Sequence, residues 1–219
     1  MRLRYLLKGY VLRMGRLREK ELFDAAISVS QPIFVTATSA NKIRNLRRAA
    51  EKISRFVFQP GDYLSFWDMI GEPSAKNGYL PGRNLVAGRL VEEDGGGLCQ
   101  LSGILYHLGL KTGLRIVERS NHSVDLYRDA ERFTPLGCDA TVVYGYKNLL
   151  MQNTTDATLY FSFEVADDAI TGRLHSDRPL TETPLRFELV EDNRRTVVET
   201  WAGREKIARS VYANYDKPA

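Results

Sequence analysis

At positions 95–102 the chain reads Gly95-Gly96-Gly97-Leu98-Cys99-Gln100-Leu101-Ser102, and a largely apolar run follows as far as Gly113. Three glycines in a row let a backbone come close to a ligand and leave the first N–H groups of a helix exposed. The pattern predicts a helix from Leu98 to Thr112 that ends at Gly113, because glycine readily adopts the left-handed conformation of a helix cap. The sequence therefore predicts a helix whose amino end is open to a ligand.

Cys99 falls in the first turn of this helix, where the helix dipole favours an anion such as a thiolate. We expect the backbone of Gly96 and Gly97, with Gln100 and Ser102, to bind an oxyanion or a ligand at the same place. The alternative is that Cys99 is a small core residue, because free cysteines are often buried. Three glycines directly before a Cys-Gln pair are an unusual way to build plain core, so the sequence favours a functional cysteine.

A thiolate nucleophile needs a base, and the chain offers three histidines. His107 lies inside the predicted helix and His175 follows a late strand, so both are interpreted as packed or surface residues. His122 opens a predicted strand, and Asp139 opens another. A cysteine at a helix start, a histidine on one strand and an aspartate on the next is the order found in transglutaminase-like enzymes. It predicts Cys99, His122 and Asp139 as catalytic residues, although His122 and Asp139 could instead be structural.

The remaining pattern predicts an α+β fold. Asn41 can cap a second helix that runs to about Arg55, with apolar residues on one face and cations on the other. Strand-like runs follow the Cys99 helix, among them 122–127, 140–146 and a pair joined by a turn at Asp192-Asn193. Helices first and mostly antiparallel strands afterwards favour α+β over alternating α/β. We expect a basic leader over residues 1–30, the main domain over 31–180 and a C-terminal strand hairpin over 181–219.

Length and composition are those of a globular protein. The chain has 219 residues, of which 43% are hydrophobic and 26% charged, so one domain with a small appendage is expected and wholesale disorder is excluded. Residues 1–20 hold seven basic residues and one acidic residue, a charge of +6, which leaves −2 for the other 199. This balance does not indicate a nucleic-acid partner. Two cysteines, Cys99 and Cys138, are too few for a disulfide framework.

The first twenty residues have apolar side chains at helical spacing and cations between them. Such a helix either packs on its own domain or lies on an anionic membrane surface. No continuous apolar run of the kind found in a secretory signal occurs there, and no segment approaches the length of a transmembrane helix. We therefore expect a cytoplasmic protein, with peripheral contact to the inner membrane through residues 1–20 as the alternative.

Several motifs resemble the VanW family, and the resemblance extends from about residue 33 to about residue 175. The motifs are Pro60-Gly61-Asp62-Tyr63-Leu64-Ser65-Phe66, Gly78-Tyr79, Gly95 to Ser102, Val117-Glu118-Arg119 with His122-Ser123, and Gly137 with Asp139-Ala140-Thr141-Val142. VanW-like proteins are named after an accessory protein of glycopeptide-resistance clusters, and many have no assigned function. Some members are associated with L,D-transpeptidation of peptidoglycan. The resemblance thus implies a link to peptidoglycan precursors, with Cys99 as the nucleophile.

Two functional hypotheses follow. In the first, Cys99 attacks a carbonyl of a peptide or peptidoglycan-precursor substrate, His122 takes and returns the proton, and Asp139 fixes the imidazole tautomer. Whether the acyl group then passes to an amine or to water stays open. In the second, the protein is a non-enzymatic binding or scaffold module that grips a ligand carboxylate at the helix start, between Gly95 and Gln100.

The substrate cleft is expected to be lined by aromatic residues and one cation, namely Tyr63, Phe66, Trp67, Tyr79 and Arg119. Ordinary core is the alternative for the aromatic residues. A metal site would have to use Cys99, His122, Cys138 and Asp139, which lack any paired-ligand spacing. We therefore expect neither a metal nor another cofactor, and the sequence does not indicate an oligomeric state.

Overall fold

The computed structural model describes residues 5–7, 12–17, 23–34, 39–86, 89–125, 133–191 and 194–213. Helices and antiparallel strands occur together in this part of the chain, which confirms the predicted α+β class. In chain order the elements are β1 (Arg16–Leu17), β2 (Ala25–Pro32), α2 (Ser39–Ile53), β3 (Phe56–Phe58), β4 (Tyr63–Ser65), α3 (Phe66–Ile70), η1 (Ala75–Asn77), β5 (Pro81–Val86), β6 (Arg89–Asp94), α4 (Leu98–Lys111), β7 (Arg115–Glu118), β8 (Leu150–Gln152), β9 (Leu159–Val165), β10 (Ala169–Ser176), β11 (Leu185–Glu191), β12 (Arg195–Ala202) and β13 (Glu205–Ala213).

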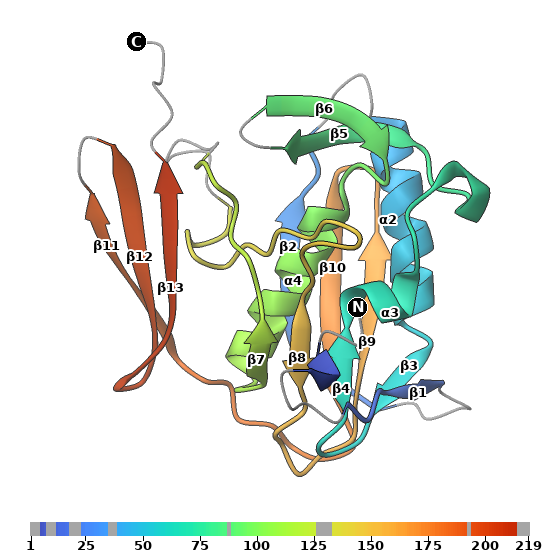
Figure 1. The fold of residues 1–219 in the computed structure, drawn as a ribbon. Helices are drawn as coiled ribbons and strands as arrows, with labels where there is room; N and C mark the ends of the chain where they lie inside the picture. Colours follow the sequence, from blue (N-terminus) through green and yellow to red (C-terminus); the bar gives the residue numbers. More distant parts are fainter. Residues whose placement is uncertain are drawn as a thin grey trace.

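A five-stranded antiparallel sheet with the order β1-β3-β9-β10-β2 forms the centre of the fold. The two long helices, α2 and α4, both pack against this sheet (Figure 1). Helix α4 also contacts the small sheet β4-β8-β7, so it lies between two sheets. Buried residues therefore occur on every side of α4, as expected for a helix that is enclosed in a core.

Two glycines allow this close packing around α4. A Cβ added to Gly172 of β10 would lie 2.4 Å from Cγ2 of Ile104. A Cβ added to Gly109 of α4 would lie 2.6 Å from Sδ of Met151 in β8. Both distances are shorter than any normal van der Waals contact, so each glycine lets the helix and a strand approach where a side chain would keep them apart.

Both helices predicted from the sequence are confirmed. Helix α4 spans Leu98–Lys111, and Gly113 behind it has a φ of +67°. Helix α2 spans Ser39–Ile53, so its start lies before Asn41. Asn41 is therefore not the cap: its Nδ2 donates to the carbonyl of Pro81 at 2.9 Å and ties α2 to β5.

The helix predicted over residues 1–20 is wrong for residues 12–17, which are extended. Arg16 and Leu17 form β1 and pair with β3, and Met14 forms a bridge with Tyr63. The edge of β3 offers unpaired backbone groups, and satisfying them overrides the helical spacing of the side chains. Much of this segment lies outside the described residues. None of the described helices is long and apolar enough to cross a membrane.

The strands predicted at 122–127 and 140–146 are also wrong where the structure describes them. Only isolated bridges occur, between Val124 and Ala213 and between Val143 and Lys147. The transglutaminase-like arrangement with His122 and Asp139 on strands is therefore absent from the described residues. Side chains replace the sheet ladder here, because Arg119 Nε and Nη2 donate to the carbonyls of Asp139 and Gly137 at 2.7 and 3.0 Å.

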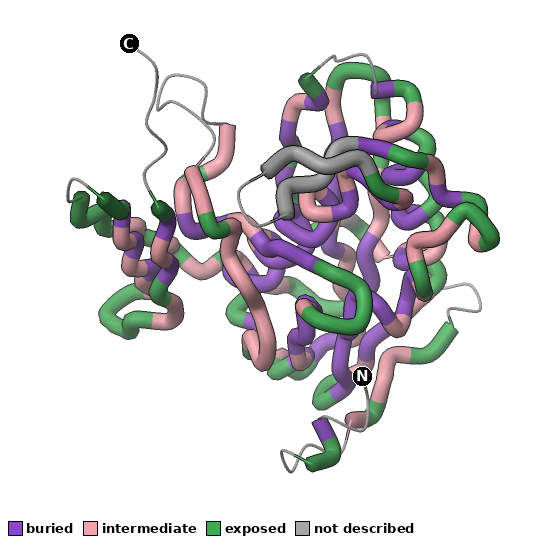
Figure 2. Tube along the Cα trace, turned by 45° about the horizontal axis from the view of Figure 1, so that its top comes forward, coloured by how far each residue is buried: buried purple, intermediate pink, exposed green. Residues whose placement is uncertain are grey.

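The C-terminal strands form a separate antiparallel sheet with the order β11-β12-β13 (Figure 1). The turn predicted at Asp192-Asn193 lies outside the described residues. Strand β11 is largely exposed, whereas β13 contacts the main body through a bridge between Ala213 and Val124 (Figure 2). The backbone N–H of Ala213 also donates to the carbonyl of Ser123 at 2.8 Å. Strand β13 thus lies beside the segment that carries His122.

Candidate active site

Cys99 lies in the first turn of α4, as the sequence predicts, and is partly exposed. Gly97 precedes the helix with a φ of +95°, a conformation that side chains disfavour. A Cβ on Gly97 would lie 2.6 Å from Cγ of Lys42, so the glycine also makes room for this lysine. The Cys99 Sγ lies 3.8 Å from the carbonyl of Val142. The loop after Asp139 therefore passes next to the sulfur.

The three residues predicted to be catalytic come together. His122 Nδ1 lies 2.6 Å from Asp139 Oδ2, and the His122 backbone N–H donates to the same oxygen at 2.6 Å. The Cys99 side chain also interacts with His122 and stabilises its charged form, so the thiol and the imidazole are neighbours. The imidazole thus lies between a carboxylate and a thiol, in the order that activation of a nucleophile requires.

The local charges favour an ionised His122–Asp139 pair at neutral pH. Burial by itself lowers the pKa of His122, but the hydrogen bonds to Asp139 and Cys99 outweigh it and raise the pKa to about 10. Burial raises the pKa of Asp139, while the hydrogen bond from His122 and the charge of Arg119 lower it to about 2. The protonated imidazole therefore lies between a carboxylate and the Cys99 sulfur, where it has a proton to donate.

Arg119 holds Asp139 from the side opposite His122. Its Nη2 donates to Asp139 Oδ1 at 2.9 Å, and the guanidinium lies 4.7 Å from the centre of the Tyr106 ring. The hydroxyl of Tyr212 donates to the same Asp139 oxygen. The Arg119 side chain is only 6% exposed, so the prediction that it lines a substrate cleft is wrong. It lies behind the carboxylate instead.

The predicted side-chain donors to an oxyanion are engaged elsewhere. The amide of Gln100 donates to the carbonyl of Pro32 at 2.9 Å, and its backbone N–H donates to Gly97 at 3.0 Å. Ser102 is fully buried and donates to the carbonyl of Ala140 at 2.6 Å, so it anchors the Asp139 loop to α4. The carbonyl of buried Gly96 accepts from Asn45 at 3.1 Å.

Three backbone donors remain at the start of the helix. Within the described residues the backbone N–H of Leu98 donates to Gly95, whereas those of Gly96, Gly97 and Cys99 have no acceptor. An N–H that belongs to the nucleophile itself is well placed to bind an oxyanion that forms at the attacked carbonyl. The position of a cysteine in the first helical turn was the sequence signal for this donor.

The aromatic residues predicted to line a cleft are buried in the core. Tyr63, Phe66, Trp67 and Tyr79 are exposed by 7% or less. Trp67 contacts the turn that follows Val142: its Nε1 donates to the carbonyl of Lys147 at 2.7 Å, and the centre of its ring lies 5.5 Å from that of Tyr144. The core interpretation of these residues is therefore the correct one.

Sequence reasoning missed the exposed aromatic residues and the C-terminal tyrosine. Tyr144 and Tyr146 are 49% and 69% exposed in the turn that follows Val142, close to Cys99. Two tyrosines around Gly145 were the available signal. Tyr212 stands 73 positions after Asp139, and no local pattern links the two residues.

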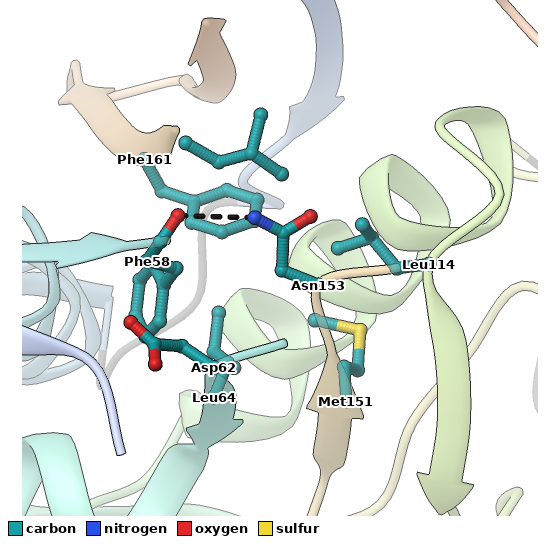
Figure 3. A pocket seen from close by; sticks show the side chains of 8 residues that line it. Phe58, Asp62, Leu64, Leu114, Met151, Asn153 and Phe161 are labelled. Atoms are coloured by element: carbon teal, nitrogen blue, oxygen red, sulfur yellow. Dashed lines mark hydrogen bonds between the residues drawn. The ribbon is translucent and has the colours of Figure 1, made fainter. Parts of the chain in front are cut away.

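A small cavity lies at the other end of α4 (Figure 3). Its walls include Phe58, Leu114 and Met151, and the Nδ2 of Asn153 donates to the Phe58 carbonyl at 3.0 Å. Leu114 follows the carboxyl end of α4, whereas Cys99 is at the amino end. The cavity therefore belongs to the core and is not connected with the cysteine.

The second cysteine differs from the first in its burial. Cys138 is fully buried, and burial raises the pKa of its thiol to about 12. Both cysteines are free. Among the described residues no group of three or more His, Cys, Asp or Glu side chains is arranged to hold a metal ion.

Comparison with known proteins places this site in a family. The family model described as VanW like protein matches residues 41–175. Vancomycin B-type resistance protein VanW of Enterococcus faecalis (strain ATCC 700802 / V583) is 32% identical over 138 residues, which are 63% of this chain and 50% of that protein. Uncharacterized protein YoaR of Bacillus subtilis (strain 168) is 34% identical over 117 residues, which are 52% of this chain and 37% of that protein.

This chain therefore spans half or less of the length of these two relatives, and no solved structure matches it. The matched region contains most of α2, all of α4, and the segments that carry Cys99, His122 and Asp139. Because the match covers more than half of the chain, the protein belongs to the VanW family.

Proposed function

We propose that this protein is a cysteine-dependent acyl transferase that acts on a peptide of the peptidoglycan-precursor type. The observation that carries the proposal is the grouping of Cys99, His122 and Asp139, in which the imidazole is hydrogen-bonded to the carboxylate and is a neighbour of the thiol. The substrate class is inferred from the name of the Enterococcus faecalis relative, a vancomycin resistance protein.

The first step forms a thioester. The Cys99 thiolate attacks the carbonyl carbon of an amide, and the resulting oxyanion is bound by the Cys99 N–H at the start of α4. His122, as the imidazolium, donates its proton to the leaving nitrogen while the C–N bond breaks. The amine departs, and the acyl group remains on the sulfur with a neutral imidazole beside it.

The second step returns the enzyme to its starting state. An acceptor amine or a water molecule attacks the thioester carbon, and His122 takes the proton from the attacking atom. The C–S bond breaks, which regenerates the Cys99 thiolate and the His122 imidazolium. An amine acceptor makes the reaction a transpeptidation, and water makes it a hydrolysis.

The test uses intact-protein mass spectrometry after incubation with a panel of peptidoglycan stem peptides. We expect a mass increase equal to the acyl part of the donor, located at Cys99 by peptide mapping and absent in Cys99→Ala. Addition of an amine acceptor then distinguishes transfer from hydrolysis by the product formed. Failure of the folded wild-type protein to form any adduct or product with the panel would contradict the proposal.

Lys42 supports a binding module as the second candidate. Its Cδ and Cε lie 3.3 Å from where a Cβ of Gly97 would be, so a cation borders the start of α4. Burial lowers the pKa of Lys42. A ligand carboxylate would be attracted both by this cation and by the helix end. In that case Cys99→Ala would still bind the stem peptides in calorimetry, whereas Lys42→Met would not.

A further inference from the structure

Strand β13 brings two polar side chains to the back of the candidate active site. Ser210 and Tyr212 are two positions apart, so they lie on the same face of the strand. Both are buried, with 0% and 1% exposure. Arg119 Nη1 donates to Ser210 Oγ at 2.6 Å, and the Tyr212 hydroxyl donates to Asp139 Oδ1. The strand thus contacts the carboxylate of the triad both directly and through Arg119.

The backbone of β13 is fastened to the segment on either side of His122. Asn121 Nδ2 donates to the carbonyl of Val211 at 2.8 Å, and the N–H of Ala213 donates to the carbonyl of Ser123 at 2.8 Å. His122 itself lies between these two attachment points. This segment has no strand of its own, so the bonds to β13 help to define the position of the imidazole.

Asp139 depends on these donors because its carboxylate is ionised and only 25% exposed to solvent. Its Oδ2 accepts from the side chain and backbone of His122, and its Oδ1 accepts from Arg119 and Tyr212. A buried carboxylate without enough donors becomes easier to protonate and free to rotate. The hydrogen bond from Tyr212 is among the interactions that lower the pKa of Asp139.

We infer that β13 is a functional part of the candidate active site. Tyr212 is a positioning residue that contacts Asp139 directly, and Ser210 is a positioning residue that acts on Asp139 through Arg119. Both residues lie outside the matched region 41–175, so the functional unit extends into the C-terminal sheet. The inference rests on the proposed role of the triad. It deepens that role, because it states which residues keep the carboxylate oriented toward His122.

The test compares Tyr212→Phe with Tyr160→Phe. The first variant keeps the buried ring and removes only the hydroxyl that donates to Asp139. The second removes the hydroxyl of Tyr160, which lies on β9 and donates to the carbonyl of Phe23 at 3.2 Å, away from Cys99. The readout is the pH profile of iodoacetamide alkylation at Cys99, resolved from Cys138 by peptide mass, which needs no acyl donor.

We expect Tyr212→Phe to slow alkylation of Cys99 at pH 7 by about tenfold, as for the loss of one hydrogen bond to a charged group. The acid limb of the pH profile should move to higher pH, because Asp139 loses a hydrogen-bond donor that lowers the pKa of its carboxyl group. Tyr160→Phe should match the wild type. In an Asp139→Asn background, Tyr212→Phe should have no further effect, since its action passes through the carboxylate. Ser210→Ala should shift the profile in the same direction and by less.

A profile of Tyr212→Phe that matches Tyr160→Phe would overturn the inference. The inference would also be overturned if Tyr212→Phe reduced the reactivity of Cys99 as much in the Asp139→Asn background as in the wild type. That result would indicate general damage to the sheet. These outcomes leave the transferase proposal standing if the wild type forms a thioester. Conversely, a Tyr212-dependent profile without any acyl transfer would support the positioning role and refute the transferase. An unreactive Cys99 in the wild type would refute both.

Discussion

The five-stranded sheet and the candidate active site hold their backbones in different ways. In the sheet, β9 and β10 pair continuously from Ile170 opposite Val165 to Ser176 opposite Leu159. Around the site, the chain on both sides of Asp139 is irregular, and its carbonyls accept from the side chains of Arg119 and Ser102. Regular pairing makes a rigid platform. Individual side-chain bonds set the position of single reactive groups.

Because of this difference, one arginine in the irregular region should contribute more to the free energy of unfolding than an exposed ion pair on the sheet. We expect Arg119→Gln to lower the free energy of unfolding by about 3 kcal/mol, because it removes the cation from an Asp139 carboxylate that is only 25% exposed. Arg173→Gln in β10 is the matched control: its pair with Glu164 is exposed, and its loss should cost at most about 1 kcal/mol. Urea unfolding measures both, and equal losses would contradict the contrast.

Loss of the imidazole should affect chemistry more than stability. We expect His122→Ala to slow alkylation of Cys99 at pH 7 by about 100-fold or more, since the partner that stabilises the thiolate is gone. His175→Ala is the control, because this histidine is bonded to Ser162 at the far end of β10. If both variants slow the reaction alike, the link between His122 and Cys99 is not the cause of reactivity.

In the five-stranded sheet, by contrast, a substitution should affect stability more than chemistry. In Gly172→Val the new side chain would collide with Ile104, where even a Cβ lies 2.4 Å from Cγ2. Overpacking of this kind costs about 1–3 kcal/mol of unfolding free energy. Gly172 contacts α4 at Ile104 and not at Cys99. We therefore expect the alkylation rate of Cys99 in the folded protein to change by less than about twofold. A large loss of reactivity would show that the sheet and the site are not separable.

The same contrast explains which features could be predicted from the sequence. Helix α4 and its open amino end follow from the glycines, the apolar run and Gly113, all of which are local. The choice of Cys99, His122 and Asp139 followed from their types and order, and the structure brings them together. The strands expected around His122 and Asp139 do not form, because side-chain bonds to Arg119 replace the ladder.

Other features had no local signal. Tyr212 reaches Asp139 only through the docking of β13, which no periodicity encodes. Trp67 was expected in a cleft because it is aromatic, but an aromatic ring fits a core equally well, and it is 5% exposed. Strand β2 begins at Ala25, inside the segment interpreted as a leader, because pairing with β10 depends on partners far along the chain.

The most direct test of the account is an NMR titration of the His122 imidazole in the wild type and in Cys99→Ala. We expect His122 to stay protonated through neutral pH with a pKa of about 10, because Asp139 and Cys99 both stabilise its charge. In Cys99→Ala the pKa should fall, since one of these partners is lost. A wild-type His122 that titrates near 6.5, the value of an unperturbed histidine, and is insensitive to Cys99→Ala would contradict the linked triad.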